Sequence, residues 1–203
     1  MTDITPFDAI PLDVEAGSPV RPRLLLLATS LTCAAVIVGY AGLIGFYASQ
    51  RAEVVAAGGA WLPDGVTIPL TQPNFMLLTL SFSLVTVIWA VSAIRANDRA
   101  NALIAFAMTL VFGFAQLAQT GYLLTLMNMP AAESEAAALI YALVGIQLAL
   151  TAVGMGYLVV MALRTLGGGY SDKDYEGVLS AALFWIMTVG VYTALWYAVY
   201  IIK

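Results

Sequence analysis

The chain of 203 residues is too apolar to fold as a water-soluble globule. Hydrophobic residues make up 62% of it and charged residues only 10%, whereas a soluble domain is about 25% charged. We therefore expect an integral membrane protein. The net charge of −4, with no basic cluster, excludes a nucleic-acid partner. The chain has no His and a single cysteine, Cys33, so we expect no internal disulfide, no haem or metal ligands and no cofactor in this chain.

Charged residues divide the sequence into five long apolar stretches, each exceeding the ~20 residues that a helix needs to cross the hydrocarbon. Pro69 and Pro73 interrupt the second stretch, so we predict that its helix begins near Asn74. The predicted fold is an all-α bundle of five transmembrane helices, at about residues 24–50, 74–94, 100–127, 136–163 and 177–201. They form one domain, residues 21–203, which follows an acidic, solvated tail at residues 1–20.

Basic residues lie mostly on one side of the predicted bundle, because they fall at alternate helix ends. Positively charged flanks stay in the cytoplasm, so the pattern predicts a cytoplasmic N-terminus and an external C-terminus. The six residues predicted inside are Arg21, Arg23, Arg95, Arg99, Arg164 and Lys173, and the two predicted outside are Arg51 and Lys203.

Small residues recur at helical spacing on the first and fourth predicted helices. In lipid such spacing lets helix backbones approach closely, which favours a packing interface. General enrichment of Gly and Ala in membrane helices explains the pattern equally well. The residues are Ala35, Gly39, Gly42 and Gly45 on the first helix, and Gly145, Ala149, Ala152 and Gly156 on the fourth.

Three amides, Gln116, Gln119 and Gln147, lie inside the predicted spans, where we expect interhelical hydrogen bonds rather than a substrate site. No charged residue and no proline interrupts the spans, which argues against a proton pump or an ion-coupled carrier. Aromatic residues near the span ends predict an interfacial belt. At the predicted outer side these are Tyr47, Trp61, Trp196, Tyr197 and Tyr200.

In the run GLIGFYASQR at residues 42–51, the loop WLPDG at residues 61–65 and the pair Pro73-Asn74, the sequence resembles the subunit III family of haem-copper oxidases, the cytochrome c oxidase subunit III family. The run GLIGFYASQR at residues 42–51 fits the family pattern of Gly-Leu-Phe, one residue, Ala-Tyr-Phe, two residues and Arg. The loop WLPDG at residues 61–65 fits Trp-Pro-Pro, one residue, Gly, and Pro73-Asn74 opens the next helix as in the family. Further matches are Gly145, Gly154 and Leu158 on the fourth helix, and Phe184-Trp185 and Tyr200 on the fifth.

The resemblance covers about Leu24 to Lys203 and implies the short five-helix form of this subunit, without two N-terminal helices of longer members. It also implies lipid tails held between helices. Several family positions differ here: a Ser-Glu pair falls on Ala35 and Val36, two His on Gln147 and Leu150, and a His and an Asp on Ile186 and Val189. The role of the family's membrane Glu in proton uptake therefore does not carry over to this chain.

The functional hypothesis is a cofactor-free accessory subunit of an aerobic terminal oxidase in the cell inner (plasma) membrane. Its expected partners are oxidase subunits I and II, which would carry the haem and copper, and membrane phospholipid. Two alternatives remain: a small membrane carrier or permease component, and a subunit III homologue of a nitric oxide reductase-type complex. The candidate lipid or subunit contacts are Gly39, Gly42, Gly45, Tyr47, Arg51, Trp61, Gly145, Gln147 and Ala149.

Overall fold

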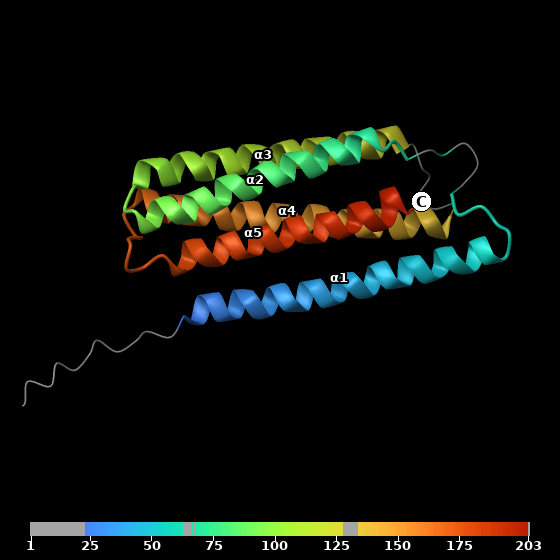
Figure 1. Ribbon diagram of the computed structural model, residues 1–203, viewed down its shortest axis with the longest axis horizontal. Helices are drawn as coiled ribbons and strands as arrows, with labels where there is room; N and C mark the ends of the chain where they lie inside the picture. The colour runs from blue at the N-terminus through green and yellow to red at the C-terminus, as the bar shows by residue number, and fades with distance from the viewer. Residues whose placement is uncertain (1–22, 63–65, 67, 128–133, 203) are drawn as a thin grey trace, which may run out of the picture.

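A computed structural model describes residues 23–62, 66, 68–127 and 134–202, and their regular structure is entirely helical. Five helices are long and apolar enough to cross a membrane, as the composition predicts (Figure 1). The fifth helix continues into a π-helical segment, η1. The elements are α1 (Leu24–Ala56), α2 (Thr71–Arg95), α3 (Arg99–Met127), α4 (Glu135–Leu166), α5 (Glu176–Leu195) and η1 (Trp196–Ile201).

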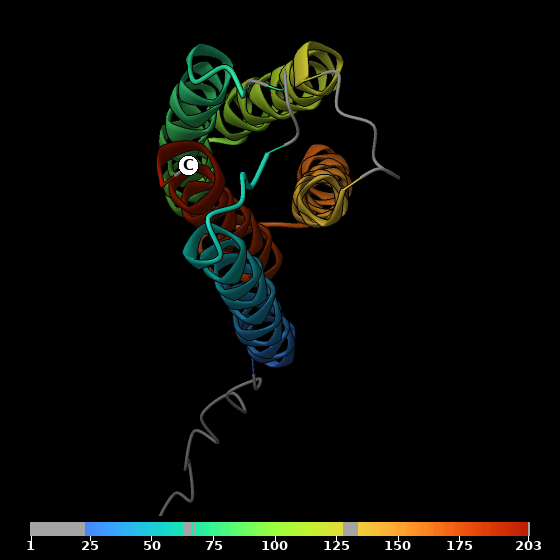
Figure 2. The same ribbon diagram turned by 90° about the vertical axis from the view of Figure 1, so that its right-hand side faces the viewer.

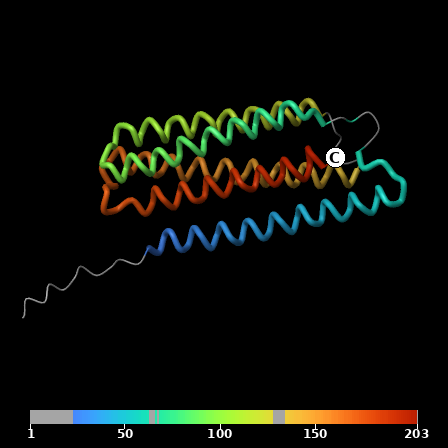
Figure 3. The backbone as a smooth tube through the Cα atoms, in the orientation of Figure 1, coloured from blue at the N-terminus to red at the C-terminus, as the bar shows by residue number. Residues whose placement is uncertain are grey.

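The helices run up and down along one long axis (Figures 1 and 3). Seen end-on, α5 lies between α1 and α2, and α4 packs beside α5 and α3 (Figure 2). The central position of α5 is clear from its burial, because 67% of its most apolar window is buried against 17% for α1. Helix α1 therefore exposes the largest share of its surface to whatever surrounds the bundle.

The helices extend past the boundaries predicted from charge. Helix α1 continues beyond Arg51 to Ala56, and α4 continues beyond Arg164 to Leu166. At about 1.5 Å per residue, both are longer than ~30 Å of hydrocarbon, so their charged turns can lie at the membrane surface. The predicted start of the second helix near Asn74 was wrong. Helix α2 begins at Thr71, and Pro73 is tolerated in its first turn, where backbone N–H groups have no intrahelical acceptor.

One end of the bundle, here called the basic end, carries Arg23, Arg95, Arg99 and Arg164. A tight turn there joins α2 to α3 through Asn97, which has a positive φ of 56°. Asp98 then caps α3, because its Oδ1 accepts a hydrogen bond of 3.0 Å from the backbone N–H of Asn101. Asn97 Oδ1 also accepts from the backbone N–H of Asp172 at 2.9 Å. The α2–α3 and α4–α5 loops are thereby joined.

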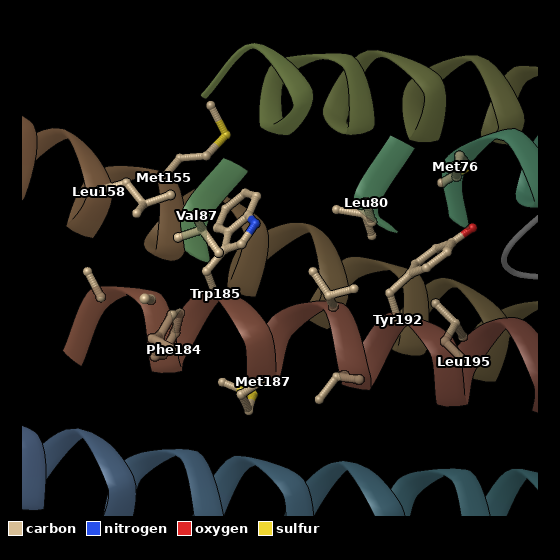
Figure 4. Close-up of a cluster of buried hydrophobic side chains, with 14 of the residues drawn as sticks. Met76, Leu80, Val87, Met155, Leu158, Phe184, Trp185, Met187, Tyr192 and Leu195 are labelled. Carbon is tan, nitrogen blue, oxygen red and sulfur yellow. The ribbon is translucent and has the colours of Figure 1, made fainter. Parts of the chain in front are cut away.

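The core is centred on the indole of Trp185, which is completely buried (Figure 4). Two glycines on neighbouring helices make room for this ring. A Cβ on Gly113 of α3 would stand 2.9 Å from Met155 Cγ and 3.0 Å from the Trp185 ring, and a Cβ on Gly154 of α4 would also stand 3.0 Å from that ring. The absence of two methyl groups thus leaves room for the large ring that α5 extends to α3 and α4.

Candidate lipid and subunit contact surfaces

The small residues singled out on α1 lie on the surface of the described chain. Gly39, Gly42 and Gly45 are exposed, and a Cβ built on any of them would meet nothing within 4 Å. Packing within this chain therefore does not explain the choice of glycine at these positions. The stripe offers a flat, narrow helix surface against which another backbone could lie closely.

A second exposed surface of small residues lies on α4. Gly145 and Ala149 are both exposed, and a Cβ on Gly145 would have no neighbour within 4 Å. Gly154 on the same helix faces Trp185 instead. Spacing alone does not distinguish these two uses of glycine, since both occur on one helix at similar intervals.

Three of the candidate residues interact with each other or with the chain end. Trp61 Nε1 donates to the hydroxyl oxygen of Tyr47 at 3.1 Å, and the two rings meet edge to face, 5.5 Å between centroids. A guanidinium N–H of Arg51 donates to the carbonyl of Ile202 at 3.0 Å. These contacts attach the segment after α1 and the end of η1 to the bundle.

The predicted aromatic belt holds only in part. Tyr197 is 57% exposed, but Tyr47 and Tyr200 are only 2% and 1% exposed, so both belong to the core. Trp196 Nε1 donates to Asn74 Oδ1 at 2.8 Å, which connects η1 with the start of α2. The position of an aromatic residue near the end of a span does not show whether its side chain is buried. Burial depends on which helices pack beside it.

Two of the three amides, Gln119 and Gln147, act as interhelical donors inside the bundle, as expected, whereas the side-chain amide of Gln116 has no hydrogen-bond partner among the described residues. Gln147 is 3% exposed, and its Nε2 donates to the carbonyl of Thr188 on α5 at 3.3 Å. Gln119 Nε2 donates to Thr79 Oγ1 on α2 at 3.2 Å. Gln147 thus lies inside the bundle rather than on its surface.

Sequence patterns missed two apolar grooves that flank α5. The first, about 390 Å³, lies between α2 and α5 and has Arg95 in its wall; we call it the Arg95 groove. Its lining is Ile88, Val91, Ser92, Arg95, Leu179, Ala182, Leu183 and Ile186. The second, about 410 Å³, lies between α1 and α5 and is lined by Ile37, Tyr40, Ala41, Ile44, Met187, Gly190, Val191 and Ala194.

Aromatic rings hold the guanidinium groups at the basic end. Arg95 and Arg23 lie 4.8 and 6.0 Å from the centroid of the Tyr175 ring, within reach of a cation–π interaction. Arg164 lies 5.0 Å from the centroid of Tyr170, whose phenol pKa is raised, mainly by burial. Aromatic rings therefore hold positive charge at the basic end of the bundle, where Arg95 also lines the groove.

These features define a class of protein, a multi-pass integral membrane protein built as a helical bundle with unpartnered faces. In the described part of the chain, no three His, Cys, Asp or Glu side chains lie together as metal ligands could. Residues 24–203 match the family described as cytochrome c oxidase subunit III. The chain belongs to this family, as the motifs around residues 42–65 indicate.

Curated relatives agree with this family at modest identity. Cytochrome c oxidase subunit 3 of Paracentrotus lividus is 27% identical over 191 residues, covering 92% of this chain and 70% of the relative. The Carassius auratus protein of the same name is 26% identical over 157 residues, 76% of this chain and 60% of the relative. The Gallus gallus protein of the same name is 28% identical over 142 residues, which cover 69% of this chain and 54% of the relative. The chain thus spans between 54% and 70% of the length of these relatives.

Proposed function

We propose that this chain is the cofactor-free accessory subunit III of an aerobic haem-copper terminal oxidase. In such a complex subunits I and II would carry the haem and copper and perform the chemistry. The chain itself would reside in the cell inner (plasma) membrane, with its N-terminus in the cytoplasm. A family match that covers residues 24–203 supports the role, and the basic end supports the orientation because it collects the described arginines other than Arg51.

The observation that carries the packing role is the exposed glycine stripe on α1. This helix is the least covered by its own chain, and Gly39, Gly42 and Gly45 have no neighbour that excludes a side chain. Lipid chains are as apolar as the helices, so helix association in a membrane depends on close van der Waals packing. We therefore assign the α1 stripe to a helix of subunit I, with Gly145 and Ala149 on α4 as a second contact.

Phospholipid is the second proposed partner, and the Arg95 groove is the site that the geometry favours. The groove has an apolar floor suited to an acyl chain, and the Arg95 side chain lines it. An anionic phosphate at that end would gain a charge-assisted hydrogen bond from the guanidinium. Arg51 and Trp61, the sequence-based candidates, lie at the opposite end and already interact with Ile202 and Tyr47. Their proposed role is to order that end of the lipid-facing surface.

Native mass spectrometry of the complex released from lipid nanodiscs tests the lipid proposal. Arg95→Gln should lower the amount of tightly bound phospholipid, because it removes the charge but keeps the apolar groove. Arg99→Gln is the matched control, since Arg99 lies at the same end but does not line the groove. Equal lipid retention by both variants would contradict the assignment.

Recovery of the complex through a tag on the N-terminal tail tests the functional role. Solubilised gently, the wild-type chain should bring down a haem-copper oxidase, and identification of the haem types separates it from a nitric oxide reductase-type complex. The carrier alternative predicts broken helices at a mid-membrane site, whereas α1 to α5 are continuous along their lengths. Recovery of the chain only as a free oligomer would favour the carrier.

A further inference from the structure

A layer of buried polar side chains crosses the apolar centre of the bundle between α3, α4 and α5. We call Gln116, Thr120, Gln147, Thr151 and Thr188 the polar layer. None of the five is more than 3% exposed. Gln116 lies seventeen residues beyond the start of α3 at Arg99, or about 25 Å along the helix. The layer is therefore deep in the membrane, where neither bulk water nor lipid headgroups reach it.

Helix register places the members of the polar layer on α3 and α4 at two successive turns of these neighbouring helices. A Cβ built on Gly113 of α3 would stand 2.9 Å from Met155 Cγ on α4, so these two residues lie at about the same level. The two helices run in opposite directions (Figure 1). One helical turn farther from the basic end than Gly113 and Met155, the next residues on the facing sides are Gln116 on α3 and Thr151 on α4. A further turn brings Thr120 and Gln147 to the same level. Gln147 also reaches α5, through its hydrogen bond to the Thr188 carbonyl.

The polar layer has more hydrogen-bonding capacity than its members satisfy. Among the described residues, neither Nε2 nor Oε1 of Gln116 has a partner, and Gln147 Oε1 has none. The hydroxyls of Thr120 and Thr151 donate to carbonyls of their own helices, at 2.8 and 2.9 Å. Their oxygens can still accept. The layer thus combines a free amide donor with several free acceptors.

Such groups are costly when left unpaired in an apolar interior, and buried polar atoms in folded proteins almost always find a partner. A partner subunit cannot supply one, because the unpaired atoms are buried within this chain. A molecule as small as water can, since buried waters typically bridge about three such groups. We propose that the polar layer is an internal water-binding site, in which Gln116 Nε2 donates to water and water donates to Gln116 Oε1 and Gln147 Oε1.

This site gives the bundle a connection that direct contacts do not supply. Water between Gln116 and Gln147 links α3 to α4, and Gln147 continues the link to α5. The three helices around Trp185 would then be joined by hydrogen bonds one turn beyond the indole. The role is separate from subunit packing, because it depends on buried residues and not on the exposed glycine stripe.

Solid-state NMR of the full chain in lipid bilayers, with ¹⁵N-glutamine, tests the site without any substitution. Magnetisation transferred from water should reach the side-chain amide of Gln116 strongly. Gln119 is the internal control: it lies nearer the end of α3, is less buried and is already paired with Thr79. If stray water entered from the membrane surface, Gln119 would be polarised at least as much as Gln116.

A water signal at Gln116 that clearly exceeds the one at Gln119, and that weakens in Gln147→Leu, supports the site. No transfer to Gln116, with a direct correlation between the Gln116 and Gln147 amides in its place, overturns it. That result would mean that the two side chains pair with each other and leave no room for water. If Gln147→Leu does not fold, the wild-type comparison of Gln116 with Gln119 still decides.

Discussion

Trp185 Nε1 on α5 donates a hydrogen bond of 2.9 Å to Ser83 Oγ on α2, and both side chains are completely inaccessible. The contact joins residues 102 positions apart. Gly113 and Gly154 leave space for the same indole. The Trp185 side chain of α5 therefore lies against α2, α3 and α4 at once. Figure 4 shows the Trp185 ring beside Val87 of α2 and Met155 of α4.

Ser83→Ala should destabilise the bundle, because it leaves the Trp185 N–H unpaired in an apolar interior. The expected loss is about 1–2 kcal/mol, given the modest worth of hydrogen bonds between membrane helices. Unfolding in mixed micelles measures it. Ser81→Ala is the control, since the Ser81 hydroxyl is exposed and donates only to Leu77 of its own helix. Equal effects of the two changes would contradict the role of the indole bond.

Gly154→Ala should destabilise by about 1–3 kcal/mol, the usual cost of overpacking a filled core. The new methyl group would lie 3.0 Å from the Trp185 ring, and the hydrogen bond to Ser83 opposes movement of that ring. Gly156→Ala, two residues along the same helix, meets nothing within 4 Å and should be neutral or slightly stabilising. Equal stability of the Gly154→Ala and Gly156→Ala variants would contradict the close packing of Gly154 against the Trp185 ring.

Gln147→Leu should lower stability in the membrane by about 0.6 to 2 kcal/mol, because it removes the donor to the Thr188 carbonyl. We expect oxygen reduction by the intact complex to be nearly unchanged. Turnover per haem, compared with wild type at equal subunit content, separates the two effects. Complete loss of turnover in an assembled complex would instead show that Gln147 takes part in the function.

Asp98 should make stability depend on pH at the basic end. Hydrogen bonds from the backbone and side chain of Asn101 lower the pKa of this carboxyl below its ordinary value. The stabilisation that the Asp98 carboxylate gives to the folded state is therefore complete above the pKa of the unfolded state, near 4. It is lost as the pH falls through the lower pKa of the folded state. Asp98→Asn should reduce the melting temperature at neutral pH, and the difference from wild type should shrink in acid. A difference independent of pH would contradict the assignment.

Charge spacing was enough to predict the five spans, because a charged side chain at mid-bilayer is costly. It could not predict where helices end, since α1 continues past Arg51 and α4 continues past Arg164. The sequence also could not predict the roles of individual glycines. Gly42 and Gly113 both lie within apolar spans, and only the helices packed beside them show that Gly113 is buried and Gly42 is exposed. The Arg95 groove has no sequence signal, because α2 and α5 that form it are far apart in the chain.

The exposed stripe on α1 is central to the proposed function, and photo-crosslinking from it tests the account most directly. A p-benzoylphenylalanine placed at Gly42 should form an adduct with a haem-carrying oxidase subunit in native membranes. The same group at Gly121 of α3, which is also exposed and has no neighbour within 4 Å, should label lipid. Adducts from Gly42 with only lipid or a second copy of this chain would contradict the account.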